Sequence, residues 1–172
     1  MHITKILSFI VTMTLLLFSC IKDDESETIN YINVNSQIPT FAVEDTAGNT
    51  FSSKQFIGKQ SLLVFFGTYC PDCKQILPVI EEVWKELKDD PRFLLVTISR
   101  KETAEVVSNY WKENQFTMPF YLDTRGEVFS LFANNTIPRI YIINPDNEVV
   151  WMAVESLDIS AKELIQKIKG LK

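Results

Sequence analysis

The stretch Leu62-Leu63-Val64-Phe65-Phe66-Gly67-Thr68-Tyr69-Cys70-Pro71-Asp72-Cys73 decides the fold. Its first part, Leu62–Phe66, is a continuous apolar run, which predicts a central strand covered on both faces. Beyond Cys73, apolar residues recur at helical spacing. They are Ile76, Leu77, Ile80, Trp84 and Leu87. The two thiols therefore lie one helical turn apart, at the point where a strand passes into a helix.

This placement suits the chemistry of disulfide exchange, in which the thiolate is the nucleophile. Cys70 lies just before the predicted helix, where unpaired backbone N–H groups and the helix dipole favour negative charge. Cys73 lies inside the first turn, where the chain is more buried, and Pro71 presets a backbone angle that suits a helix start. We therefore expect a lower pKa for Cys70 than for Cys73, with Cys70 as the nucleophile and Cys73 as the resolving thiol.

Asp72 lies between the two cysteines, and its negative carboxylate disfavours the thiolate form of a nearby cysteine. The positive charge of Lys74 favours the thiolate form. These two opposing charges leave the direction of electron flow open.

The composition limits the other chemistries. The chain of 172 residues has three cysteines, a single histidine and a formal net charge of −5. A zinc site would need two more ligands than Cys70 and Cys73 supply, and the histidine, His2, lies in the N-terminal leader. No metal or cofactor is therefore predicted, although two thiolates could bind copper(I). An acidic chain without basic clusters argues against a nucleic-acid partner.

The first residues predict export. Residues 1–19 combine Lys5 with an apolar run too short to span a bilayer comfortably, as in a signal peptide. The run ends in Leu17-Phe18-Ser19-Cys20, which resembles a bacterial lipobox and predicts lipidation of Cys20. An ordinary secretory signal or an uncleaved anchor are the alternatives. Residues 20–36 are polar and acid-rich and predict a tether, or a sorting tag similar to that of surface lipoproteins in the Bacteroidota.

Residues 37–172 predict one α/β domain. A turn-rich link at 45–49 suggests a small N-terminal hairpin, and further strands are expected at Phe93–Ile98, Arg139–Ile143 and Val149–Val154. Helices are expected at Thr103–Asn114 and after Ser160, which has capping-box spacing. The predicted order is βαβ, then a small α/β insertion, then ββα.

These motifs together resemble the thioredoxin superfamily, specifically its membrane-tethered TlpA/ResA type. Phe65–Cys73 is similar to the aromatic-Gly-Thr-Trp-Cys-x-x-Cys signature, with Tyr69 in place of the tryptophan. Pro78 matches a family proline, and Thr136-Ile137-Pro138-Arg139 looks like the loop that carries a cis-proline opposite the thiols. Phe116–Asn135 lies where this type carries its insertion. The family's two proton acceptors are replaced by Val64 and Ile76.

The resemblance implies a thioredoxin fold, with a central mixed β-sheet flanked by helices. It also implies that Pro138, Ile137 and Tyr69 shape a substrate groove beside Cys70. The implied activity is reduction or exchange of disulfides in exported proteins, such as apocytochrome c, with electrons from a membrane thiol carrier. The expected location is the cell envelope, outside the cytoplasm. The alternatives are a non-catalytic surface lipoprotein that binds a partner and has a structural disulfide, or a copper(I) carrier.

Overall fold

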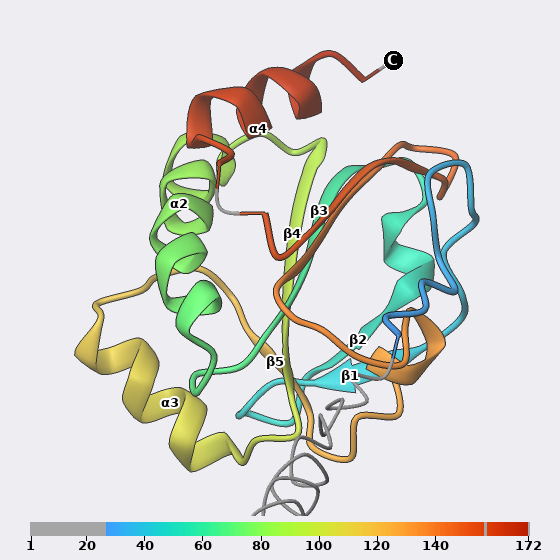
Figure 1. Ribbon diagram of the computed structural model, residues 1–172. Coiled ribbons are helices and arrows are strands. Elements are labelled where there is room, and N and C mark those ends of the chain that lie inside the picture. Colours follow the sequence, from blue (N-terminus) through green and yellow to red (C-terminus); the bar gives the residue numbers. More distant parts are fainter. Residues whose placement is uncertain (1–26, 157, 172) are drawn as a thin grey trace, which may run out of the picture.

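The computed structural model describes residues 27–156 and 158–171. A seven-stranded sheet forms its centre, in the order β2-β1-β5-β4-β3-β6-β7 (Figure 1). The strands are β1 (Ala42–Glu44), β2 (Thr50–Ser52), β3 (Gln60–Phe66), β4 (Phe93–Arg100), β5 (Tyr121–Asp123), β6 (Arg139–Ile143) and β7 (Val149–Val154). Central β3 runs parallel to β4 and antiparallel to β6, so the sheet is mixed, as predicted.

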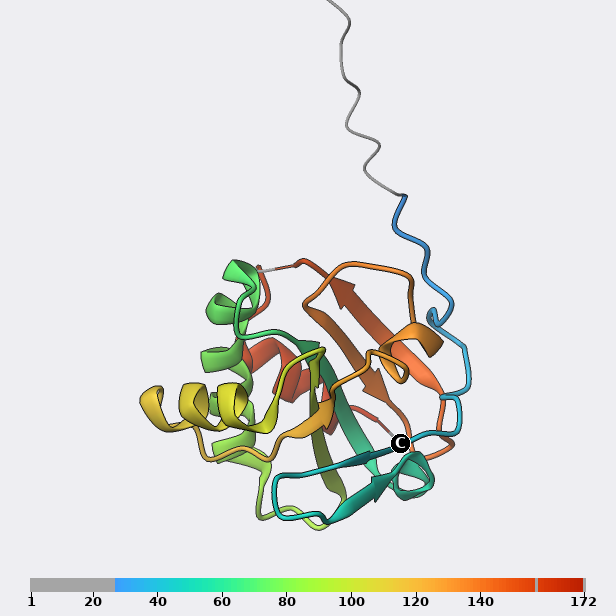
Figure 2. The ribbon, with the colours of Figure 1, turned by 90° about the horizontal axis from the view of Figure 1, so that it is seen from below.

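The helices cover the two faces of the sheet unequally. In the part of the chain that the structure describes, the α-helices lie on one side of the sheet and the 3-10 helices lie on the other (Figures 1 and 2). The α-helices are α2 (Pro71–Leu87), α3 (Ala104–Glu113) and α4 (Ala161–Lys169). The 3-10 helices are η1 (Ser53–Phe56) and η2 (Phe129–Leu131).

Strand β3 is buried throughout because both of its faces are covered. Successive side chains of a strand point to opposite faces. Phe66 packs on Trp111 of α3, with ring centroids 4.9 Å apart, whereas Phe65 packs on Phe132 on the other face, at 4.8 Å. The apolar run in the sequence is therefore a central strand that is covered on both faces, as predicted.

The hairpin and the last helix form as their sequence signals indicate. β1 pairs antiparallel with β2, with Val43 opposite Phe51. Ser160 caps α4 in a capping box with Glu163. The predicted small α/β insertion is confirmed, since it holds the short strand β5 and the 3-10 helix η2.

Described residues before the predicted boundary at residue 37 also contact the domain. Asn30 and Gln37 form single β-bridges with Ala133 and Glu148, and the N–H of Tyr31 donates to the carbonyl of Phe132 at 2.9 Å. The backbone makes these contacts while most side chains stay exposed, so the sequence carries no hydrophobic period there. Residues 27–36 of the predicted tether thus lie against the domain.

The predicted signal peptide and the predicted lipidation site Cys20 lie outside the described residues. Within residues 27–156 and 158–171, no helix has the length and apolar character that crossing a bilayer requires.

The insertion is fastened to α2 by a buried carboxylate. Glu81 is 4% exposed and accepts hydrogen bonds from the N–H and hydroxyl of Thr117 and the N–H of Met118, at 2.7–3.1 Å. Burial by itself would raise the pKa of Glu81, but the hydrogen bonds from Thr117 and Met118 outweigh it and lower the pKa below its usual value. The ionised form is therefore the one that the fold prefers.

Replacing Glu81 with Gln should lower the free energy of unfolding at pH 7 by about 2 kcal/mol, because charge-assisted bonds are lost. A lowered pKa in the folded state means that the unfolded state binds more protons at acid pH. The stabilisation is therefore complete above the usual glutamate pKa and declines as the pH falls below it. Urea unfolding at pH 7 and at about pH 3.5 measures both effects.

The matched control is Glu82→Gln, a change at the neighbouring exposed glutamate of the same helix. It should stay within about 0.5 kcal/mol of the wild type. Equal losses for the two variants at pH 7 would contradict the anchoring role of Glu81.

Candidate functional site: a dithiol at the start of α2

The first thiol is fixed by the backbone of the helix that follows it. Cys70 is the N-cap of α2, in an extended conformation, and Pro71 occupies the first helical position. The Cys70 Sγ accepts a hydrogen bond from the N–H of Cys73 at 3.2 Å. The sulfur thus takes the place of the oxygen that usually caps a helix, and it lies where the helix dipole favours negative charge.

The second thiol lies behind the first. Cys73 has no exposed surface, whereas Cys70 retains 8%. Burial raises the pKa of the Cys73 thiol, and a hydrogen bond with Cys70 and the charge of Asp72 act in the same direction. The two cysteines are free in this structure.

A second loop faces Cys70 from the start of β6. The Ile137–Pro138 peptide bond is cis, as predicted. The Cys70 thiol donates to the carbonyl oxygen of Ile137 at 3.5 Å. The loop and the thiol are thus in direct contact, although 67 residues separate them in the chain.

Tyr69 lies on the outer side of this contact. Its side chain is 58% exposed. A Cβ on Gly67 would come within 2.6 Å of the Tyr69 ring and 3.0 Å of the Ile137 side chain, so glycine makes room for both. Tyr69 and Ile137 therefore both lie over Gly67, near Cys70, and the substrate groove that they are expected to form stays a prediction.

Sequence reasoning missed a buried carboxylate beneath the thiol loop. Glu102 follows β4, is 9% exposed, and accepts hydrogen bonds from the N–H and hydroxyl of Thr68 and from the hydroxyl of Ser99. It thereby anchors the turn two residues before Cys70. One sequence signal could have found Glu102. Neighbouring parallel strands end at the same edge of a sheet, so residues that follow β3 and β4 lie close together.

Sequence reasoning also missed Arg139, the first residue of β6. Its side chain is fully buried. The guanidinium donates to the carbonyl oxygens of Asn135 and Thr136 at 2.8–3.2 Å and to Oδ1 of Asn30 at 2.6 Å. No sequence signal marked its burial, because an arginine at the start of a predicted strand is expected to be exposed.

The two positions where the family has proton acceptors are apolar here. Val64 and Ile76 are both buried in the core. The proton acceptor for Cys73 therefore comes from another group or from water.

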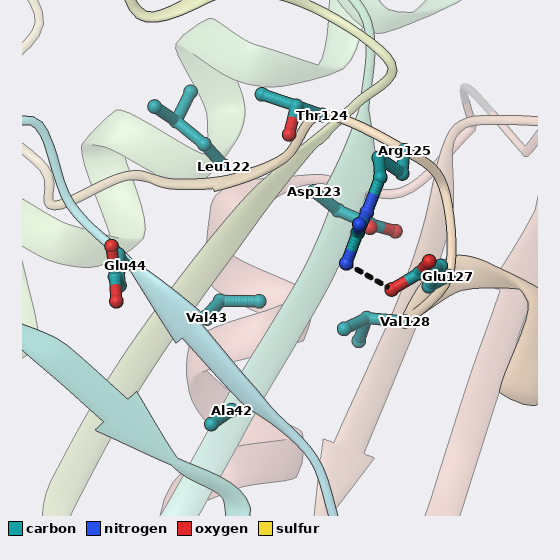
Figure 3. A pocket seen from close by; sticks show the side chains of 9 residues that line it. All are labelled: Ala42, Val43, Glu44, Leu122, Asp123, Thr124, Arg125, Glu127 and Val128. Carbon is teal, nitrogen blue, oxygen red and sulfur yellow. Dashed lines mark hydrogen bonds and ion pairs between the residues drawn. The ribbon is translucent and has the colours of Figure 1, made fainter.

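A hollow of about 220 Å³ lies elsewhere, between β1 and the loop after β5 (Figure 3). Its rim includes the ion pair between Arg125 and Glu127, at 3.0 Å. Neither cysteine lines it.

The chain is similar in sequence and in structure to known proteins. The sequence profile of the AhpC/TSA family matches residues 34–152. The thiol-disulfide oxidoreductase ResA of Bacillus subtilis is 30% identical over 119 residues, which cover 69% of this chain and 66% of ResA. The chain thus spans just under two thirds of the length of that relative.

Two solved structures are similar throughout the domain. A candidate protein disulfide isomerase from Bacteroides thetaiotaomicron has a TM-score of 0.76 and 26% identity, covering 81% of this chain and 90% of its own. StoA from Bacillus subtilis has a TM-score of 0.64 and 25% identity, covering 75% and 96%. These comparisons confirm the predicted superfamily and fold, and relate the chain to thiol-disulfide oxidoreductases.

The burial of Cys73 predicts a one-sided alkylation of the reduced protein. Because burial raises the pKa of Cys73 above its ordinary value, this thiol should stay protonated where an ordinary cysteine begins to ionise. Iodoacetamide should therefore add one label per chain, at Cys70, throughout pH 6–9. Peptide mass spectrometry locates the label, and unfolding in urea supplies the control in which both thiols react. Labelling of native Cys73 at pH 7 would contradict its assigned position.

Proposed function

The chain belongs to the AhpC/TSA family of the thioredoxin superfamily, and on that premise we propose that it reduces disulfide bonds in exported proteins. One observation carries the proposal. The Cys70 sulfur caps α2 next to the surface, and Cys73 waits fully buried behind it. A nucleophile near the surface with a protected partner one turn away is what stepwise exchange needs.

The exchange follows from this order of the thiols. The Cys70 thiolate attacks one sulfur of the substrate disulfide, which forms a mixed disulfide and releases the other substrate sulfur as a thiolate. Cys73 then loses its proton and attacks Cys70 Sγ, which releases the second substrate thiolate and leaves a Cys70–Cys73 disulfide. Two electrons pass from the protein to its substrate, and a second dithiol must restore the reduced form.

The substrate is held by the loop of Ile137 and Pro138 in this proposal. An extended peptide next to that backbone can pair with it as an added strand, which brings a cysteine of the peptide toward Cys70. Tyr69 supplies an exposed aromatic surface at the same place. Exported proteins with cysteines, such as apocytochrome c, suit this mode, and a membrane thiol protein suits the role of electron donor.

A lipid anchor at Cys20 completes the proposal and places the domain outside the cytoplasm. The main-chain carbonyl of Glu27 accepts a hydrogen bond from the Asn134 side chain, close to the cis-proline. Glu27 lies seven positions after Cys20, and a fully extended chain over seven positions reaches about 25 Å. An anchor at Cys20 would therefore keep the thiols near the membrane, within reach of a membrane-bound donor.

Two cysteine variants test the activity. Cys70→Ser should abolish the reduction of insulin disulfides, because the nucleophile is lost. Cys73→Ala should keep the first step and accumulate mixed disulfides, which gel shifts under non-reducing conditions and mass spectrometry of the adducts detect. The adducts also identify the natural substrates.

Each cysteine variant is the control for the other. Adducts that also form in the Cys70→Ser variant would contradict the nucleophile assignment. A wild-type Cys70–Cys73 bridge that resists strong dithiol reductants would favour the alternative of a structural disulfide in a binding protein. Stoichiometric copper(I) binding without disulfide reduction would favour the carrier alternative.

Cys20→Ala tests the anchor separately. The variant should leave the membrane fraction and appear in the soluble extracytoplasmic fraction, whereas Ser19→Ala should stay with the membrane because the cysteine is kept. Fractionation followed by immunoblotting measures both. Membrane retention of the Cys20→Ala protein would show that lipidation is not the anchor.

A further inference from the structure

The first described residues lie along the loop that carries the cis-proline. We call residues 27–32 the strap and residues 133–138 the cis-proline loop. Figures 1 and 2 show the strap in blue beside the orange chain around η2. Asn134 fastens the two segments, since its Oδ1 accepts from the N–H of Ile29 at 2.8 Å and its Nδ2 donates to the carbonyl of Glu27 at 2.9 Å.

The strap also completes the bonding of a buried charge. Arg139 pairs with no carboxylate among residues 27–156 and 158–171. Its bonds to the carbonyls of Asn135 and Thr136 leave one guanidinium nitrogen for Asn30 Oδ1, at 2.6 Å. A buried charge without such partners is costly. Asn30 therefore ties the strap to the inner side of the cis-proline loop.

The loop holds one residue in a strained conformation. Thr136 has a φ of 76°, which a β-branched residue adopts only when its surroundings enforce it. Two contacts enforce it here. Arg139 Nε donates to the Thr136 carbonyl at 2.8 Å, and the hydroxyls of Thr28 and Thr136 lie 2.9 Å apart. One contact comes from β6 and the other from the strap.

The strained residue directly precedes the one that faces the nucleophile. The carbonyl of Ile137 lies 3.5 Å from Cys70 Sγ, and its direction depends on the backbone angles of Thr136. Relaxation of Thr136 to a negative φ would turn the following peptide away from the sulfur. The strap and Arg139 thus act on the substrate side of the thiol site without touching either sulfur.

We propose that the strap, through Asn30 and Thr28, is a positioning element that holds Thr136 so that the Ile137 backbone receives a polypeptide substrate beside Cys70. This inference rests on the proposed disulfide reductase function and adds a source of substrate selectivity. A protein disulfide needs the oriented backbone of the cis-proline loop. A small disulfide such as glutathione disulfide needs only access to Cys70.

The test compares Asn30→Ala with Asn33→Ala in the full chain. Both residues are exposed asparagines of the same segment, but the Asn33 side chain bonds only to the Asn30 carbonyl, at 3.2 Å. Asn30→Ala should slow insulin reduction about tenfold, since small misplacements of a binding group have large rate effects. Its rate with glutathione disulfide should stay within about twofold, and Asn33→Ala should match the wild type with both substrates.

Two further variants separate positioning from simple loss of stability. Asn30→Asp keeps an oxygen acceptor for Arg139 and should restore the insulin rate. Thr28→Val leaves the hydrogen bonds of Arg139 intact and should slow insulin reduction by a smaller factor than Asn30→Ala. Thermal unfolding of each variant ensures that every rate is measured well below its transition.

The strain itself is tested with Thr136→Gly, because glycine adopts positive φ without cost. In that background, Asn30→Ala should slow insulin reduction by a smaller factor than it does in the wild type. The inference is overturned if Asn30→Ala matches Asn33→Ala, or if it slows both substrates equally. A wild type that reduces neither substrate would instead overturn the proposed function.

Discussion

The site depends on the unpaired N–H groups at the start of α2. This helix begins at the edge of the sheet where the parallel strands β3 and β4 both end. The first turn of a helix must find acceptors for its free donors, and here Cys70 Sγ accepts from the N–H of Cys73. The proposed nucleophile is therefore placed by a backbone requirement rather than by the preference of a side-chain rotamer.

The two-sided core separates the roles of two chemically identical thiols. The residue that caps α2 has to lie at the end of the helix, close to solvent, whereas a residue three positions later points into the core. Burial holds the pKa of Cys73 above its ordinary value. In the proposed mechanism, this burial keeps Cys73 protonated and protected from other reagents until a mixed disulfide forms next to it. The proposed order of attack thus follows from the capping position of Cys70 and the burial of Cys73.

Buried polar groups hold the loops around the thiols in place. Glu102 binds Thr68 on one side of Cys70, and Arg139 binds the loop before Pro138 on the other. Both are charged side chains whose partners are mainly main-chain groups and hydroxyls. Such bonds fix backbone positions more firmly than surface ion pairs do. The strap adds further hydrogen bonds to this network from residues 27–32. It thereby links a segment close to the proposed anchor with the cis-proline loop.

The sequence alone determined the strand Leu62–Phe66, the helix after Cys73, the thiol pair and, by resemblance, the cis-proline loop, because each of these is encoded in residues close together in the chain. Local signals also gave the hairpin and the capping box at Ser160. Tertiary structure alone decided the positions of Glu102, Arg139 and the strap. Their roles depend on contacts between distant parts of the chain: Glu102 binds Thr68, 34 residues away, and the strap binds Asn134 and Arg139, 105 to 109 residues away. Many of these partners are main-chain groups, which leave no pattern of residue types for a sequence to display.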